Sequence, residues 1–226
     1  MHFRDFEQPF FSLCVRCDVT HLKAALARRP GGGRLSLALH HQALRLANEQ
    51  TPFRMRLQGQ GDDSKVLVYE RVDASTTVLR ADESFGFAIL RWQPSYRQFE
   101  QVSASALAEV MAAPPNLSEP TQSEMDAAPG AAPGAATYAA PLMYFTTLPW
   151  AHFSSFAHAR RGHGQADSTP RVAFGRIDVE GAGPQARHWL PVALDVHHAL
   201  MDGLHAGRWL QAFEAALAAP DSWLDS

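Results

Sequence analysis

The sequence is poor in several features that identify common protein classes. It has two cysteines in 226 residues, Cys14 and Cys17, spaced C-x-x-C with no second pair. Because strand residues three positions apart point to opposite faces, we expect neither a disulfide nor a metal site there. Charge of one sign is not in excess either, since the formal net charge is −3. We therefore expect no nucleic acid and no anionic membrane as partner.

Long apolar runs and familiar catalytic motifs are also missing. No uninterrupted apolar stretch reaches the length of a membrane span, and the first residues lack the order of a secretory signal. A cytoplasmic location is the resulting expectation. The patterns G-x-S-x-G, G-x-G-x-x-G and G-x-x-x-x-G-K-S/T are absent, so neither a serine hydrolase nor a nucleotide-binding fold of those types is indicated.

The apolar pattern, at 46% apolar residues, predicts an α/β protein. Residues 112–140 are rich in alanine, proline and glycine without an apolar period, and we expect a flexible surface excursion within a single domain of residues 1–226. A linker between two domains is the alternative. Strands are expected at 9–19, 53–57, 65–72, 76–79, 85–90, 171–177 and 189–198, and regular structure is expected to resume at 143–150. Helices are expected at 21–29, with Thr20 as the N-cap, at 36–50, at 101–113 and after Gly203.

The prediction of fold and function depends mainly on the stretch that follows Trp189. Apolar residues alternate along it, with His198 on the same face, and a helical stripe begins after Gly203. His197 lies on the opposite face with Asp195 and need not enter a dry core. A histidine fixed at a strand-to-helix junction is a natural general base, because its unperturbed pKa lies near neutrality. The residues of the two stripes are Leu190, Val192, Leu194 and Val196, then Ala206, Leu210, Phe213 and Leu217.

Simpler interpretations of these residues remain open. His198 could be a hydrogen-bonded core histidine, or it could ligate a metal together with Asp202 and His205. Asp202 could also cap the following helix. A second histidine pair, His40 and His41, is expected on the surface and flank of the helix at 36–50, because no acid or third ligand accompanies it.

Several motifs resemble those of the chloramphenicol acetyltransferase family of coenzyme A-dependent acyltransferases. The segment H-H-A-L-M-D-G from His197 resembles the family's H-H-x-x-x-D-G signature, and Y-F-T-T-L-P-W from Tyr144 resembles its S-S-L-P-W block. Pro52–Met55 and Glu7–Phe11 are similar to further family segments. The resemblance implies a two-layer fold with a mixed β-sheet and helices packed on one side. It covers most of the chain apart from 112–140.

The resemblance also implies a mechanism. His198 would take the proton from an acceptor hydroxyl, which then attacks the acetyl thioester of acetyl-CoA. Thr146 falls in register with the family's serine, whose hydroxyl stabilises the oxyanion. Asp202 resembles a structural aspartate that an N-terminal arginine normally neutralises; the chain begins just after that position, so Arg4 is a candidate substitute. His198 must then face a crevice shared with Thr146.

The same resemblance assigns the binding residues. Chloramphenicol is the best single candidate for the acceptor, and no metal is expected. His158, Arg160 and Arg171 stand where the family has aliphatic residues, which favours an acceptor of polar or anionic character. The expected acetyl-CoA residues are Trp150, Gly175 and Arg176, and the expected acceptor residues are Phe10, Phe11, Tyr144, Phe156 and His158.

A homotrimer with interfacial sites is implied, in which the base and the rest of the pocket come from different subunits. Two other functions stay open. One is a lipoyl-dependent acyltransferase, which is disfavoured because no lipoyl module precedes the motif. The other is a family member that binds acyl-CoA or a hydrophobic ligand without turnover.

Overall fold

The computed structural model describes Phe3, Phe6 and residues 9–59, 64–114, 141–160 and 167–225. The predicted excursion at 112–140 lies, from residue 115 on, outside these residues and stays a prediction, as does the single domain. The elements are β1 (Phe10–Asp18), α1 (Thr20–Arg28), α2 (Leu35–Glu49), η1 (Thr51–Arg54), β2 (Met55–Gln58), β3 (Lys65–Val68), β4 (Asp73–Leu79), β5 (Phe85–Leu90), α3 (Tyr96–Ala112), β6 (Leu142–Thr147), β7 (Arg171–Phe174), β8 (Asp178–Glu180), η3 (Gly183–Gln185), β9 (Arg187–His197), α5 (Gly203–Ala218) and η4 (Pro220–Ser222).

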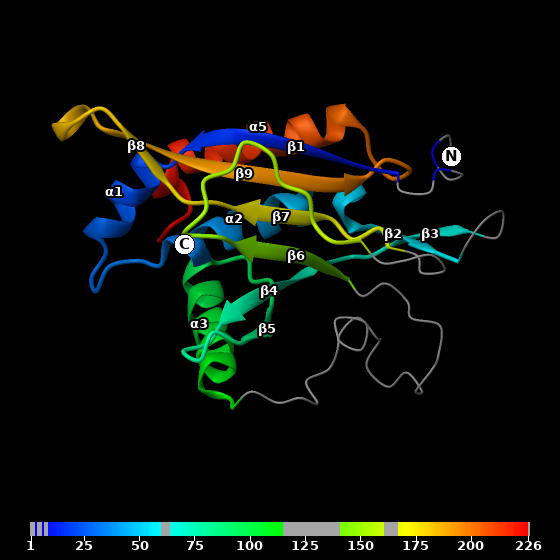
Figure 1. Ribbon diagram of the computed structural model, residues 1–226, viewed down its shortest axis with the longest axis horizontal. Helices are drawn as coiled ribbons and strands as arrows, with labels where there is room; N and C mark the ends of the chain where they lie inside the picture. The colour runs from blue at the N-terminus through cyan, green and yellow to red at the C-terminus, as the bar shows by residue number, and fades with distance from the viewer. Residues whose placement is uncertain are drawn as a thin grey trace.

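A seven-stranded mixed sheet forms one layer of the molecule (Figure 1). Its order is β1-β9-β7-β6-β4-β5, and β8 pairs with one end of β9. The β4–β6 and β6–β7 pairs are parallel, whereas the β1–β9, β7–β9 and β4–β5 pairs are antiparallel. Strands β2 and β3 form a separate antiparallel pair, as the two strand-like runs around 53–72 predict.

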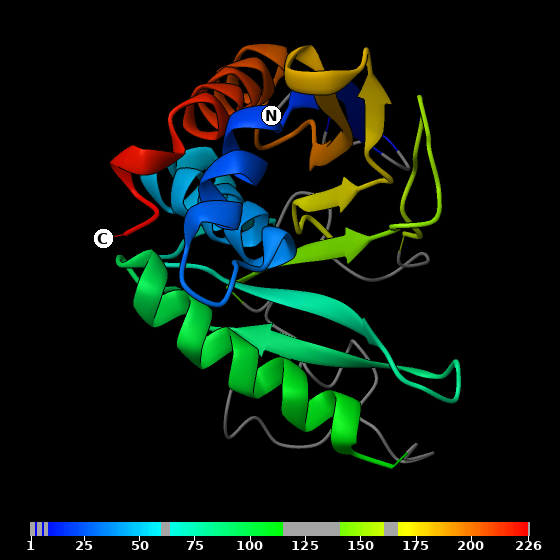
Figure 2. The same ribbon diagram turned by 90° about the vertical axis from the view of Figure 1, so that its left-hand side faces the viewer.

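The helices cover one face of the sheet, and the segment 148–160 crosses the other (Figure 2). We call these the helix side and the open side. The apolar residues of β9 belong to one core cluster with buried residues of α1, α2 and α5. This arrangement confirms the predicted two-layer fold with helices on one side. Among the described residues, no helix is long and apolar enough to span a bilayer.

Strand β9 runs between β1 and β7, and its residues from Leu190 to His197 are all buried. Alternation places Leu194 and Val196 on the helix side and Asp195 and His197 on the open side. The predicted strand is therefore correct in position and in face, although it ends at His197, one residue before His198.

Helix α2 corrects the prediction for the second histidine pair. His40 is 3% exposed and His41 is 1% exposed, so neither lies on the surface. Every residue from Leu37 to Leu44 is buried, because α2 packs against the sheet and against α1, α3 and α5. His40 stacks on Phe145 with ring centroids 4.9 Å apart. A helix enclosed on several sides has no single buried stripe.

Two local predictions about the first strand and helix have different outcomes. The cysteines are free, and Cys17 is buried, which raises the pKa of its thiol to about 12. Absence of a disulfide between Cys14 and Cys17 is thus confirmed. The expectation that Thr20 caps the first helix is wrong, because Thr20 is already helical and its N–H donates to Asp18 Oδ1 at 2.9 Å.

Candidate active site

His198 lies in the turn that joins β9 to α5. Its N–H donates to the carbonyl oxygen of Pro9. The imidazole stacks on Phe3, with ring centroids 3.8 Å apart, and contacts Phe11 at 4.7 Å. The side chain is half-buried, and its Nδ1 has no hydrogen-bond partner among the described residues. Aromatic rings on two sides therefore restrict the imidazole without using its nitrogen atoms.

His197 is buried on the open side, contrary to the expectation that it could stay outside a dry environment. It is 5% exposed, its ring meets Phe10 edge-on at 4.9 Å, and its Nδ1 accepts from the Ala199 N–H at 3.2 Å. Burial, helped by the positive charge of Arg160, lowers its pKa to about 4. His197 is therefore neutral near pH 7.

Asp202 is the N-cap of α5, as one of its interpretations predicts. Its carboxylate accepts from the N–H groups of Leu204 and His205, and its Oδ1 lies 2.8 Å from His205 Nδ1. The backbone hydrogen bond from His205 lowers the pKa of Asp202. Arg4 falls outside the described residues, and no described arginine lies within ion-pair distance of Asp202. The described partners of this carboxylate are thus those of a helix cap.

The three-ligand metal interpretation finds no support in the geometry. Asp202 and His205 contact each other, but His198 is held between aromatic rings. Within the described residues, no group of three histidine, cysteine or acidic side chains could hold a metal ion.

Thr146 lies on the open side of β6 and lines a cavity of about 260 Å³. Tyr144 from the same strand and His158 from the segment 148–160 line it too. Strands β4 and β5 provide Ser75, Thr77 and Phe87. The structure therefore brings Thr146 together with two of the predicted acceptor residues.

The three predicted acetyl-CoA residues lie together near the carboxyl ends of β6 and β7. The Arg176 N–H donates to the Ala151 carbonyl oxygen at 2.7 Å, which joins the strand end to the residue after Trp150. Trp150 is 61% exposed. A Cβ at Gly175 would lie 2.8 Å from Phe153 and 2.8 Å from Pro191, so only glycine permits this close approach. An exposed indole and an exposed guanidinium therefore lie at one end of the sheet.

The predicted acceptor residues separate into two groups. Phe11 lies on the helix side against His198, away from the cavity. The other four lie on the open side, where Phe156 meets His158 edge-on at 4.7 Å, and where the Arg171 guanidinium lies 5.3 Å from the Phe10 ring and 5.4 Å from the Tyr144 ring.

A row of polar side chains crosses the open side in strand register. Asp195 pairs with Ser12 of β1 on one side and with Arg171 of β7 on the other. Arg171 pairs with Tyr144 of β6, and Tyr144 pairs with Ser75 of β4. Cross-strand partners share a face of the sheet. We call Ser12, Asp195, Arg171, Tyr144 and Ser75 the polar row.

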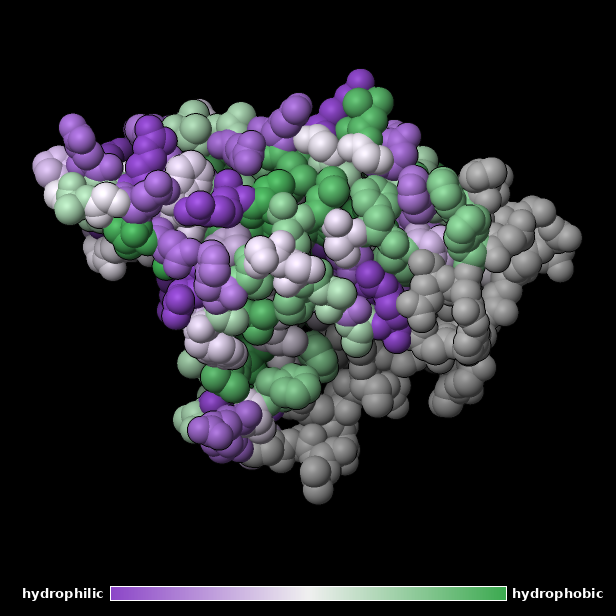
Figure 3. Space-filling view, turned by 45° about the horizontal axis from the view of Figure 1, so that its top comes forward, coloured by the Kyte–Doolittle hydropathy of each residue, from purple (hydrophilic) through white to green (hydrophobic). Residues whose placement is uncertain are grey.

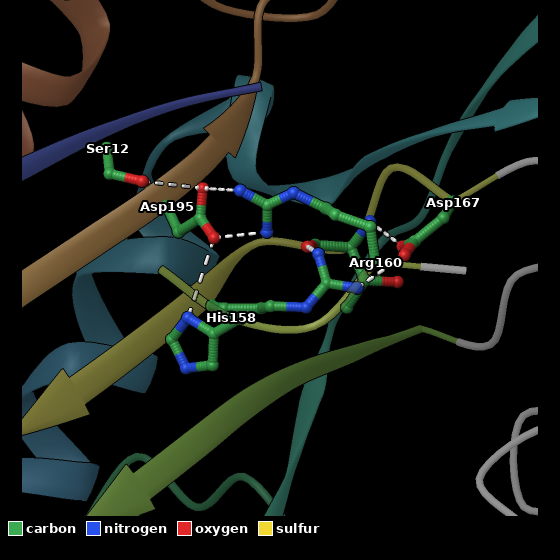
Figure 4. A network of polar contacts seen from close by, with 7 residues as sticks. Ser12, His158, Arg160, Asp167 and Asp195 are labelled. Carbon is green, nitrogen blue, oxygen red and sulfur yellow. Dashed lines mark hydrogen bonds and ion pairs between the residues drawn. The ribbon is translucent and has the colours of Figure 1, made fainter. Parts of the chain in front are cut away.

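The Asp195 carboxylate is fully buried at the centre of a hydrogen-bonded network (Figure 4). Arg160 donates to both of its oxygens, Ser12 Oγ donates to Oδ1 at 3.1 Å, and His158 Nδ1 lies 3.5 Å from Oδ2. Burial alone would raise the pKa of Asp195, but the hydrogen bonds from His158, Arg160 and Ser12, with the charge of Arg160, lower it. Asp195 is therefore an ionised group that fixes the segment 148–160 to the sheet.

The ion pairs of Arg160 and Arg171 weaken the argument for an anionic acceptor. Arg160 is paired with Asp195, and Arg171 is paired with Asp167 and donates to the Thr169 carbonyl oxygen at 3.0 Å. Both guanidinium groups thus have carboxylate partners within the chain, so their charge gives no reason to expect an anion. His158 remains as a polar group in the cavity.

His198 and Thr146 do not share a crevice within one chain. Thr146 is in register with Ala193 through β7, and His198 lies five residues further along, a distance on the order of 16 Å at 3.3 Å per residue. Two strand spacings separate them sideways as well. His198 also does not line the cavity that contains Thr146. Their joint action therefore requires a second copy of the chain.

The sequence motifs leave out three members of the polar row, which are Asp195, Ser12 and Ser75. The signal for Asp195 is present, since it interrupts the apolar run from Leu190 to Val196. A carboxylate at such a position requires partners, because burying an unpaired charge is costly. Ser75 gives no comparable signal.

Comparison with known proteins agrees with the motifs. A family model described as chloramphenicol acetyltransferase matches residues 1–214. A chloramphenicol acetyltransferase from Streptomyces acrimycini is 28% identical over 227 residues, covering 99% of this chain and 90% of that protein. Chloramphenicol acetyltransferase 2 of Escherichia coli is 26% identical over 94% of this chain and 89% of its own length.

A solved structure supports the fold independently. A chloramphenicol acetyltransferase structure superimposes with a TM-score of 0.77 at 18% identity, covering 96% of this chain and 92% of that one. At this identity the likeness concerns the fold alone.

Proposed function

The chain belongs to the chloramphenicol acetyltransferase family and is an acyltransferase enzyme; on this premise, we propose that it transfers the acetyl group of acetyl-CoA to a hydroxyl of a small molecule. Chloramphenicol is the first acceptor to test. The observation that carries the proposal is the cavity in which Thr146 lies with Tyr144 and His158, beside the strand ends that hold Trp150 and Arg176.

The proposed reaction uses two protein groups on the reacting atoms. His198 accepts the proton of the acceptor hydroxyl as its oxygen forms a bond to the acetyl carbonyl carbon. The Thr146 hydroxyl donates to the carbonyl oxygen while it carries negative charge. The carbonyl then re-forms, the bond from carbon to sulfur breaks, and the coenzyme A thiolate takes the proton from His198. The products are the acetyl ester and the free thiol.

The proposal includes assembly of at least two copies, with three as the family resemblance suggests. Its support is geometric: His198 is half-exposed at one end of β9, while the Thr146 cavity lies on the open side of β6 in the same chain. Figure 3 shows hydrophobic side chains gathered in the middle of one face between hydrophilic ones. In a closed ring of copies, His198 of each subunit would reach the cavity of its neighbour.

Trp150 and Arg176 are proposed to hold the coenzyme. An exposed indole offers a stacking surface to adenine, and a guanidinium can bind phosphate through two parallel hydrogen bonds. Both are more than one-third exposed, and they lie at the end of the sheet next to Thr146. This placement would bring the thioester to the Thr146 end of the cavity.

The test is thiol release from acetyl-CoA with and without chloramphenicol. His198→Ala is expected to lower kcat by on the order of a thousandfold, the typical contribution of general base catalysis. His21→Ala, which removes an exposed histidine on α1, is the matched control and should leave the rate unchanged. Retained turnover by folded His198→Ala would exclude the mechanism. Acetyl-CoA binding by the unaltered protein without thiol release for any hydroxyl acceptor would favour the binding function instead.

Subunit mixing tests whether the site lies between copies. His198→Ala and Thr146→Ala are each expected to be inactive alone. When the two are co-assembled in equal amounts, random mixing should regenerate about a quarter of the sites, because one subunit supplies the imidazole and its neighbour the hydroxyl. Complete inactivity of verified mixed assemblies would show that both groups must belong to one chain, and the proposed mechanism would fail.

A further inference from the structure

Two of the residues that line the cavity beside Thr146 carry buried polar atoms that have no hydrogen-bond partner among the described residues. Ser75 is 2% exposed and its Oγ makes no hydrogen bond there. The His158 side chain is 10% exposed; its Nε2 has no partner, and its Nδ1 has only the 3.5 Å contact with Asp195 Oδ2. Both residues line the same cavity. A buried polar group without a partner is unfavourable, so two such residues at one place indicate that something else satisfies them.

The other nitrogen indicates how the imidazole is oriented. Nδ1 faces the Asp195 carboxylate at 3.5 Å, and Nε2 points away from it (Figure 4). Because Asp195 is ionised and held by Arg160 and Ser12, it favours the tautomer that carries hydrogen on Nδ1. Nε2 is then an acceptor, and its partner must be a donor.

The second polar atom approaches the cavity from the sheet. Ser75 is the β4 end of the polar row and pairs with Tyr144 across the parallel strands. Its hydroxyl can both donate and accept. A ligand lying between β4 and the segment 148–160 would meet a fixed acceptor on one side and an adaptable hydroxyl on the other.

We propose that His158 Nε2 and Ser75 Oγ select the acceptor, and that this acceptor carries, besides the hydroxyl that is acetylated, a second hydroxyl or an amino group that donates to His158. The inference rests on the proposed function and names its substrate class: polyols and amino alcohols rather than acceptors whose remaining part is apolar. Asp195 is a positioning residue in this scheme, since it holds the imidazole and does not reach the ligand.

The test compares matched acceptors on matched variants. Aryl-substituted 1,3-diols and 3-amino alcohols are assayed by thiol release and by calorimetric binding, each against the same alcohol with a methyl group in place of the second donor. The donor-bearing compounds should have a KM about tenfold lower, the worth of one well-formed hydrogen bond. His158→Leu and Ser75→Ala should each remove most of this preference, because the KM of the donor-bearing compounds rises toward that of their controls.

Two further variants separate recognition from structure. His158→Gln places an amide near the position of Nε2 and should restore part of the preference. Ser105→Ala, a serine exposed on α3, should leave it intact. If only water fills the cavity, His158→Leu and Ser75→Ala will keep the selectivity of the unaltered protein, and the proposal is wrong.

The remaining outcomes are equally decisive. Loss of kcat at saturation with unchanged KM in His158→Leu would overturn the proposal and identify His158 as the proton acceptor. Failure of every donor-bearing compound to bind the unaltered protein would also overturn it. If instead His198→Ala keeps full turnover while His158→Leu still loses the preference, the proposed mechanism fails and this inference stands.

Discussion

The two faces of β9 are both buried, but they are buried by different chemistry. On the helix side, Val192, Leu194 and Val196 pack with the aromatic residues of α5 in one apolar cluster. On the open side, Asp195 lies under an irregular segment and is surrounded by a guanidinium, an imidazole and a hydroxyl. Apolar burial there would have been sufficient for stability, and the polar side is the one on which we propose that the acceptor binds.

The largest effect is expected on the helix side. Phe213 is fully buried, stacks on Trp209 at 5.1 Å and lies 6.2 Å from Phe174. Phe213→Ala should lower the free energy of unfolding by about 4 kcal/mol through lost burial and the cavity left behind. Denaturant unfolding followed by circular dichroism measures this. A loss below about 1 kcal/mol would mean that this side is loosely packed.

On the open side, removal of a single charge should be nearly as damaging. Asp195→Ala leaves Arg160, whose side chain is 16% exposed, without its carboxylate, and the expected loss is about 3 kcal/mol. The double variant Asp195→Leu with Arg160→Leu should recover most of that loss, because no charge is left unpaired. If the double variant is no more stable than the single one, the network contributes to stability in its own right.

Loss of the Thr146 hydroxyl should slow catalysis with little effect on stability. Thr146→Val keeps the shape and removes the hydroxyl, so the barrier should rise by about 3 kcal/mol, on the order of a hundredfold in kcat. The free energy of unfolding should barely change, since the side chain is only half-buried. Thr146→Ser should retain activity. Equal rates for the valine and serine variants would show that the hydroxyl of Thr146 takes no part in the reaction.

Acidification should lower the free energy of unfolding through buried histidines on both faces of the sheet, by less per pH unit than the substitutions above. Burial lowers the pKa of His40 to about 3, of His41 to about 4 and of His197 to about 4. Near their ordinary pKa of about 6.5 the unfolded chain binds protons that the folded chain does not. The free energy of unfolding should therefore decrease as pH falls from 6.5 toward 4, by at most about 1.4 kcal/mol per pH unit for each group.

Single variants show which face carries this dependence. His40→Leu should make the free energy of unfolding less dependent on pH, because it removes a buried imidazole from the helix side. His197→Gln should do the same by removing one from the open side. Urea unfolding at several pH values provides the measurement. A curve that is flat from pH 6.5 to 4 in the unaltered protein would show that the burial of these imidazoles is not maintained.

The regular part of the fold is predictable from the sequence, and the irregular part is not. Alternation along 189–198 and the stripe after Gly203 correctly predict β9 and α5, because each pattern reflects one buried face. The same reasoning fails for His40 and His41, since α2 is enclosed on several sides. Periodicity carries no information about how many neighbours a helix has.

The candidate site is predictable only where a motif or an interrupted run marks it. Thr146, Tyr144 and His158, which the family resemblance names, line one cavity. Pairing of Asp195 with Ser12, 183 residues away in the chain, depends on strand order, and pairing with Arg160 depends on the path of an irregular segment. Neither is encoded by local spacing.

The pairing of β1 with β9 also determines when the protein can fold during its synthesis. Among the residues that the structure describes, the first strand pairs only with residues 189–197, so it must wait on the ribosome until β9 has emerged. Until then its backbone groups and those along one edge of β7 stay open to other nascent chains. Yield in the cell should therefore depend on chaperone capacity and translation speed more than on the final stability of the fold.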